Sequence, residues 1–432
     1  MRTRRNVLSR ITSWGLMLAL GSFAFGLDSL AAQRTLTTPA TPEALASQYR
    51  QLNRTAMVAA QAIKDRFSLD ANATAKALRA GGYMGGMIGT GVRAVFALNA
   101  SGVASALAAA GFESGLIALV LKNEFSLTAA AIAAVLIGQD FNMTDIAVGL
   151  KAAGFGITDI VVALAQHYRQ NPDAVVNALK AAGYSSDDYG VPLIQAFGLT
   201  LQDFAALMKR TVHSVGQTVR VMFRRLARSI DAAVALIGAF VLRTAREVAA
   251  ALKEGGYPAK DVAEAIKVQF SLGSTAVAAE LFASGFDATS AGVAIATIFG
   301  LNDEATGLAL TAGGYGAIEV AVALKSRFGI SRDRAAAILK KANRGATQVG
   351  QALKNAYTAT REQVAASLRV SGFPPTDTAR AIREAYAASA ADVARAMWAA
   401  AFSLPDLQTA LGVVFGLTLL QVGQLLASLG IG

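Results

Sequence analysis

An aromatic residue recurs along this chain at a fixed interval, and this period constrains the fold more than any other feature. The residues close successive apolar helical patterns: Phe67, Phe96, Phe125, Tyr168, Phe197, Phe240, Phe270, Phe299, Phe328, Tyr357, Tyr386 and Phe415. The last six are 29 residues apart without exception. A fixed period of this length is typical of proteins that stack one small structural unit many times.

A second aromatic series divides each repeat into two halves of about 14 or 15 residues. It follows the first series by 16 residues and comprises Tyr83, Phe112, Phe141, Tyr184, Phe286, Tyr315 and Phe373. Within one half, Val262, Ile266 and Phe270 are four residues apart and share one face of a helix. Each half therefore predicts one short helix.

Residues that start and stop helices occur at the matching places. Helix-capping side chains three residues after the first series are Asp70, Asn99, Thr128, Asn171, Thr200, Asn302, Ser331, Thr360, Ser389 and Thr418. Glycines that would supply a left-handed turn at the other end are Gly82, Gly111, Gly154, Gly183, Gly256, Gly285, Gly314 and Gly372. Caps, stops and period agree, so we expect two helices in every repeat.

Helices this short are not stable alone and must stack on their neighbours. The sequence therefore predicts an all-α fold, an α-solenoid of right-handed type with about twelve 29-residue helix-pair repeats. Two intervals in the first series, Phe125 to Tyr168 and Phe197 to Phe240, are 43 residues long, which predicts two extra half-repeats. We expect an N-terminal array over 56–200, an irregular basic segment over 201–245 and a C-terminal array over 246–432.

The N-terminus has the features of an export signal. Arginines precede an apolar stretch from Trp14 to Leu27, and Ser29 and Ala31 provide small residues for cleavage, so we interpret 1–31 as a signal peptide. The stretch from Thr3 to Leu8 contains two consecutive arginines and resembles the twin-arginine signal, although Val7 stands where Phe is commonest. Residues 32–55 would be a linker and the first helix. The expected location is periplasmic, cell-surface or secreted.

The composition argues against several kinds of chemistry. The chain has no cysteine and only two histidines, His167 and His213, which excludes thiolate metal sites and leaves little basis for histidine catalysis. Each histidine is more simply interpreted as structural. We expect no catalytic residue, no metal site and no cofactor.

Basic residues form two patterns in a chain of net charge +11. One is a cluster without acidic neighbours between Phe204 and Ser229, where longer helices could interrupt the array: Lys209, Arg210, Arg220, Arg224, Arg225 and Arg228. The other is a ladder near helix ends: Lys64, Arg79, Arg93, Lys122, Lys151, Lys180, Lys253, Lys267, Lys325, Lys340, Lys354, Arg369 and Arg383. The ladder either complements helix dipoles or forms a track for a polyanion.

The C-terminal end has no charged residue from Leu407 to Gly432. The candidate apolar docking residues there are Leu419, Leu420, Val422, Leu425, Leu426 and Leu429. Terminal repeats of a solenoid normally have a polar outer face, so this end predicts docking against another copy or a membrane surface.

These features predict an exported, non-enzymatic repeat protein that binds or scaffolds another macromolecule, either a protein or an acidic glycan. One alternative is a membrane-associated or self-assembling structural protein of the cell envelope. The second is a polyanion-binding or nucleic-acid-binding array, which the export signal makes less attractive because nucleic acid is an unlikely partner outside the cytoplasm.

Overall fold

The computed structural model describes residues 39–169, 171–225 and 227–431, and this part of the chain folds into 27 α-helices without a strand. The segment interpreted as a signal peptide lies outside the described residues. The helices are α1 (Pro42–Gln51), α2 (Ala56–Phe67), α3 (Ala71–Ala80), α4 (Gly85–Phe96), α5 (Ala100–Ala109), α6 (Ser114–Phe125), α7 (Ala129–Ile137), α8 (Met143–Ala152), α9 (Ile157–His167), α10 (Pro172–Ala181), α11 (Ser186–Phe197), α12 (Leu201–Arg210), α13 (Val215–Arg224), α14 (Ser229–Phe240), α15 (Ala245–Glu254), α16 (Ala259–Phe270), α17 (Ser274–Ala283), α18 (Ala288–Phe299), α19 (Asp303–Ala312), α20 (Ala317–Phe328), α21 (Arg332–Lys341), α22 (Ala346–Tyr357), α23 (Arg361–Val370), α24 (Pro375–Tyr386), α25 (Ala390–Ala399), α26 (Leu404–Phe415) and α27 (Leu419–Ser428).

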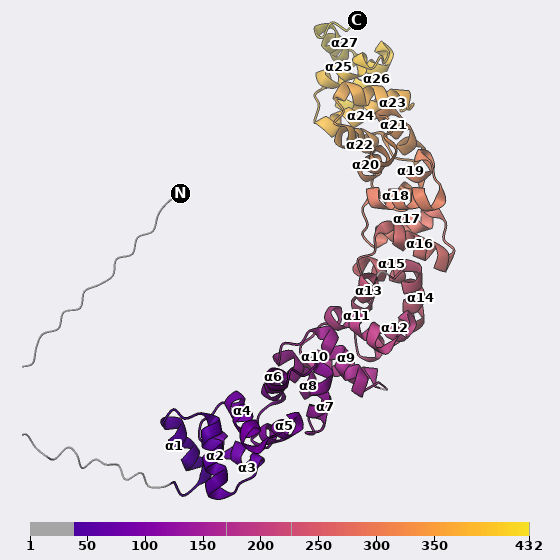
Figure 1. Cartoon of the computed structure of the whole chain (residues 1–432). Helices are drawn as coiled ribbons and strands as arrows, with labels where there is room; N and C mark the ends of the chain where they lie inside the picture. Colours follow the sequence, from indigo (N-terminus) through magenta and orange to yellow (C-terminus); the bar gives the residue numbers. More distant parts are fainter. Residues whose placement is uncertain (1–38, 170, 226, 432) are drawn as a thin grey trace, which may run out of the picture.

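The helices form a long, curved array two layers thick (Figure 1). Odd-numbered helices stack on odd-numbered ones and even-numbered helices on even-numbered ones, while consecutive helices pack across the two layers. We call these the odd layer and the even layer. The predicted all-α solenoid is therefore confirmed.

Two classes of helix alternate along most of the chain. Long-class helices have 11 or 12 residues and end at a first-series aromatic residue, as α2 does at Phe67, except that α9 ends one residue before Tyr168. Short-class helices have 9 or 10 residues, and their last turn is followed by a left-handed residue, usually Gly, and then by the second-series position. Every predicted cap accepts a hydrogen bond from its helix N-terminus, and every predicted stop glycine has a positive φ.

Small residues at the fifth helical position let the stacked helices approach closely. Gly89 of α4 is an example, since a Cβ atom there would lie 2.7 Å from Val120 of α6. Gly307 of α19 meets Ile338 of α21 in the same way, at 2.5 Å. Leu, Ile and Val side chains between the layers are buried, and they form three core clusters that follow one another along the array.

The two predicted extra half-repeats exchange the two helix classes between the layers. Short-class helices follow one another at α7 and α8, and again at α12 and α13. Long-class helices consequently lie in the even layer up to α6, in the odd layer at α9 and α11, and in the even layer again from α14. The pitch does not change, because α6, α8, α10 and α12 begin 29 residues apart at Ser114, Met143, Pro172 and Leu201.

The prediction of longer helices in the basic segment is wrong. Helices α12 and α13 have ten residues each, and caps at Thr200 and Ser214 start them in the usual way. The stop between them was missed because Val212, a residue that seldom adopts a positive φ, takes the left-handed position that glycine fills elsewhere.

In the described part of the chain, no single helix has the length and apolar composition needed to cross a membrane. The pair α26 and α27 passes that test only when taken together, and the chain bends by 116° between them.

Candidate functional site

The basic cluster lies at the second layer exchange, on α12, on α13 and in the linker before α14. Most of its charge is paired with aspartates. Arg210 Nε lies 2.9 Å from Asp173 Oδ1, and Arg224 Nη2 lies 3.3 Å from Asp187 Oδ2. Arg220 also pairs with Asp187, at 3.6 Å.

The remaining pair of the cluster is local: Arg228 Nε lies 3.0 Å from Asp231 Oδ2. Lys209 and Arg225 are exposed and make no ion pair with the described residues. Asp173 belongs to α10 and Asp187 to α11, the helices that precede α12 and α13 in their layers. The sequence could not show that these aspartates lie beside the arginines, because this depends on which helices stack. The cluster is thus much less positive than its sequence indicates.

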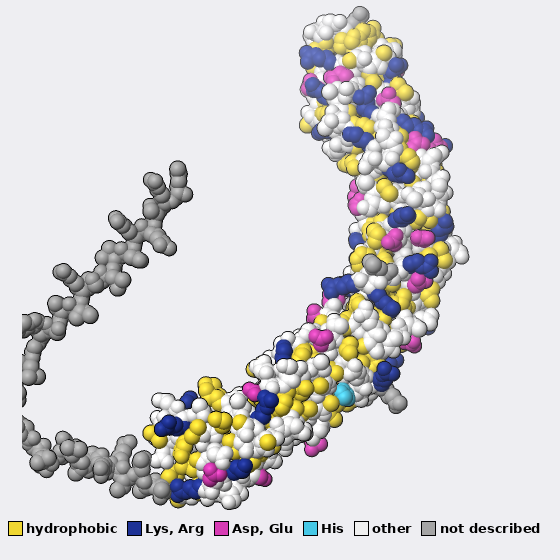
Figure 2. Space-filling model, viewed as in Figure 1, with side chains coloured by type: hydrophobic (Ala, Val, Ile, Leu, Met, Phe, Trp, Pro, Cys, Tyr) yellow, Lys and Arg dark blue, Asp and Glu magenta, His cyan; other side chains and the backbone are white. Residues whose placement is uncertain are grey.

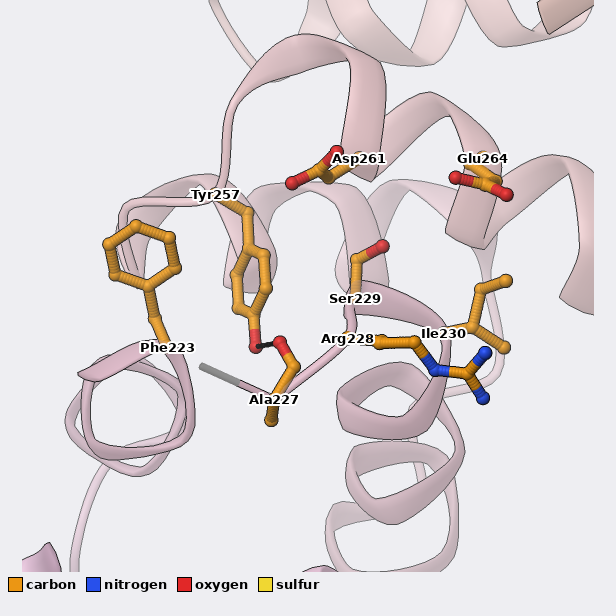
Figure 3. Close-up of a pocket in the computed structure, with 8 residues that line it drawn as sticks. All are labelled: Phe223, Ala227, Arg228, Ser229, Ile230, Tyr257, Asp261 and Glu264. Carbon is orange, nitrogen blue, oxygen red and sulfur yellow. Dashed lines mark hydrogen bonds between the residues drawn. The ribbon is translucent and has the colours of Figure 1, made fainter. Parts of the chain in front are cut away.

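A pocket of about 330 Å³ opens beside the cluster (Figure 3). It is lined by Phe223, Ala227, Arg228, Ser229, Ile230, Tyr257, Asp261 and Glu264. The Tyr257 hydroxyl donates to the Ala227 carbonyl oxygen at 2.9 Å, and burial raises the pKa of Tyr257 to about 12. Asp261 and Glu264 line this pocket together with Arg228, so its charged groups are of both signs.

A buried polar network lies between α11 and the linker that joins α12 to α13. His213 Nε2 lies 2.6 Å from the Tyr189 hydroxyl, and His213 Nδ1 lies 3.0 Å from the Thr211 hydroxyl. His213 occupies the second-series position, so it fills the space of a Tyr or Phe in other repeats. Burial, aided by the charge of Lys180, lowers the pKa of His213. This placement supports the structural interpretation of His213. His167 Nε2 lies 3.3 Å from the Ala130 carbonyl oxygen.

The cationic ladder joins each repeat to the next. With the exception of Arg369, every member donates to the backbone carbonyl 31 residues ahead, at the end of the next helix in its layer. Lys122 Nζ, for example, lies 2.8 Å from the Ala153 oxygen and 4.4 Å from the centre of the Phe155 ring. Helix C-termini present carbonyl groups without a partner in their own helix, and the ladder satisfies them. Twelve of the thirteen ladder residues are therefore engaged within the protein.

Exposed apolar side chains gather on the outer surface of the even layer. The sixth helical position faces outward there, and it holds Leu119, Val148, Val234, Val293 and Val322, each 38–43% exposed. At the N-terminal end of the same layer, Met57, Val58, Met84 and Met87 are also exposed. We call these nine residues the even-layer stripe. In the odd layer, Val162 is the one large apolar residue exposed at the sixth position among the described residues.

Charged residues of both signs are scattered over the whole length of the visible face, and apolar side chains gather toward its N-terminal end (Figure 2). The even-layer stripe could have been suspected from the 29-residue spacing of Leu119 to Val148 and of Val293 to Val322. Sequence alone did not show which helical positions the stacking leaves exposed.

The apolar C-terminal residues divide into core and surface. Val422 and Leu426 are buried, Leu425 and Leu429 are half-buried, and Leu419 and Leu420 are 76% and 72% exposed. Docking at this end would therefore depend on Leu419 and Leu420.

No known family model matches this chain, and no curated protein matches it. Among the described residues no group of three His, Cys, Asp or Glu could hold a metal ion. The features that remain for a functional argument are the even-layer stripe and the C-terminal end.

Proposed function

We propose that this chain is an exported, non-enzymatic scaffold that binds another protein along the even-layer face. The observation that carries the proposal is the even-layer stripe, in which five of the thirteen even-layer helices place a large apolar side chain at the outward-facing sixth position. Scattered single apolar residues are normal on a surface, but a recurring row along one layer is typical of a binding face.

A protein partner fits better than a polyanion. The core of a protein–protein interface is depleted of charged residues, and its rim is polar. Most of the basic residues that would attract a polyanion are instead engaged, by carbonyl groups in the ladder and by aspartates in the basic cluster. An extended solenoid offers many such contacts in a row, which suits an elongated partner. Export is proposed from the N-terminal segment alone.

The experiment compares two triple variants of equal size. Replacing Leu119, Val293 and Val322 by Gln removes apolar groups from the even layer, while replacing Ala134, Ala250 and Ala337 by Gln alters the exposed sixth position of the odd layer. Each protein would be used to capture partners from a cell-envelope extract, and the captured protein would be identified and titrated by calorimetry. We expect the even-layer variant to bind at least roughly tenfold more weakly, a change of about 1.4 kcal/mol, and the odd-layer variant to bind normally.

Equal binding by both variants would refute the even-layer face. Capture of a glycan or lipid that is insensitive to both sets of changes would favour the alternative functions.

A further inference from the structure

The two layers of the array end differently at the C-terminus. In the twelve even-layer helices before α26, the fifth residue is Ala, Gly or Val and is buried. At Gly89, Gly292 and Gly350 a Cβ atom would lie within 4 Å of the next helix of the layer. In α26 this residue is Gln408, which is exposed. A long polar side chain at the stacking position ends the even layer, because another helix packed there would bury its amide group.

The odd layer has no such ending. The fifth residue of α27 is Gly423, and a Cβ atom built there would meet nothing within 4 Å. Gly190 and Gly307 hold the same position in α11 and α19, where a residue of the next helix packs against them. Among the described residues, no helix packs against this stacking surface of α27.

This surface is a single row along the helix. Leu419, Gly423 and Ala427 are four residues apart, so they share one face, and all three are exposed. Leu420 adjoins the row and is 72% exposed. A glycine at the centre with a large side chain at one end allows two helices to approach closely when they run in opposite directions.

We propose that this row is a dimer interface, in which α27 packs against α27 of a second copy about a two-fold axis at Gly423. The axis makes the two helices antiparallel, so Leu419 of each copy lies over Ala427 of the other. Such an interface is self-complementary, as two-fold interfaces must be.

The structure favours a second copy over the other possible occupants. No charged residue lies between Leu407 and Gly432, so two identical ends can meet without burying an unpaired charge. Head-to-tail addition of another array would require both layers to continue, and Gln408 opposes this in the even layer. A membrane surface usually also attracts basic residues, and the C-terminal end has none. The inference goes beyond the proposed function and does not depend on the even-layer stripe.

Charge exchange at the proposed axis tests the interface. In a two-fold pair, Gly423→Glu places two carboxylates opposite each other, and Gly423→Lys does the same with two ammonium groups. Both changes leave the fold intact, because the position is open and both residues favour a helix more than Gly does. Gly238→Glu in α14, another exposed helical glycine with nothing within 4 Å, is the matched control.

Molar mass would be measured by light scattering and sedimentation for the full chain and its variants. We expect the unmodified chain and Gly238→Glu to be dimers whose mass does not change with salt. Each Gly423 variant alone should associate at least roughly tenfold more weakly, and an equal mixture of the two should recover the dimer.

A monomeric unmodified chain overturns the proposal, and so does a mixture that fails to recover the dimer. A second measurement tests whether the chain floats with vesicles of phosphatidylglycerol. If the unmodified chain is monomeric and floats with vesicles while Gly423→Glu does not, the α27 surface binds lipid and the dimer is refuted.

Discussion

At the scale of single residues, five of the glycine stops after short-class helices combine two demands: Gly111, Gly154, Gly183, Gly285 and Gly372. The residue must have a positive φ, and it must leave room for the cation of the previous repeat. Gly285 has a φ of +79°, and a Cβ atom on it would lie 2.9 Å from Lys253 Nζ. Sequence alone identified the glycines through the first demand. The second could not be seen, because it depends on a residue 32 positions earlier in the chain.

Replacing Gly285 by Val should destabilise the protein by about 1 kcal/mol or more, since Val resists a positive φ. The measurement is urea-induced unfolding followed by circular dichroism. Gly238→Val is the control, because Gly238 lies within α14 with open space around it, and it should change stability little. Identical unfolding curves for both variants would refute the assignment of Gly285 to a strained turn.

The reverse change is expected to stabilise. Val212 has a φ of +59° at the equivalent stop and is 86% exposed, so its side chain contributes little packing. Val212→Gly should raise the free energy of unfolding by roughly 1 kcal/mol, because it relieves backbone strain at no cost in contacts. A lower melting temperature for this variant would show that the strain is compensated elsewhere.

At the scale of helices, the ladder explains how neighbouring helix ends are held together. A cation near a helix C-terminus looks the same in a sequence whether it complements its own helix or reaches the next one. The sequence therefore left the ladder undecided between a structural role and a polyanion track. The structure places Lys253 Nζ 2.8 Å from the Ser284 carbonyl oxygen and 4.8 Å from the centre of the Phe286 ring.

Lys253→Met should lower the stability by about 1–3 kcal/mol, because it keeps most of the aliphatic stem but leaves helix-end carbonyls without their charged donor. Lys260→Met, at an exposed position of α16, is the matched control and should be nearly neutral. Thermal unfolding of both variants at low and high salt would measure the difference. If Lys253→Met lowers the stability no more than Lys260→Met does, the ladder has no structural role.

The buried contact between Tyr189 of α11 and His213, in the linker between α12 and α13, predicts a pH dependence of stability. Burial, with a smaller contribution from Lys180, lowers the pKa of His213 below its usual value near 6.5. The folded state then binds a proton less readily than the unfolded state. The stability that neutral His213 contributes is therefore complete above about pH 6.5 and is lost as the pH falls from there toward the folded-state pKa.

Replacing His213 and Tyr189 together by Phe should remove this loss. The second-series position already accepts Phe in other repeats, and the double change avoids leaving a buried hydroxyl without a partner. The measurement is the melting temperature of the double variant and of the unmodified chain over a mildly acidic pH range. If the double variant loses as much stability as the unmodified chain on acidification, another group is responsible.

At the scale of the whole molecule, the period predicted the helices, their order and their stacking, because caps, stops and aromatic ends are local signals. The 43-residue intervals also predicted the two extra helices. Their consequence, the exchange of helix classes between layers, could not be read from the sequence, because it follows from which helices stack. The exposed faces depend on the same stacking. The even-layer stripe and the open surface at Gly423 therefore emerged only from the structure.

The exchange leads to a prediction about deletions. Removing residues 143–156, which form α8 and its linker, would join Asn142 directly to α9, so that a long-class helix follows a short-class helix as in regular repeats. Every later helix would change layers, but each junction would be of a kind already present in the array. We expect the protein with this deletion to fold and to unfold cooperatively, because repeat arrays depend mainly on contacts between neighbours.

Removing residues 274–287, which form α17 and its linker, instead brings two long-class helices together, an order that occurs nowhere in the described chain. We expect that variant to lose cooperative unfolding, as measured by circular dichroism during heating. Equal melting of the two deletions would show that helix class does not determine which helices can be neighbours.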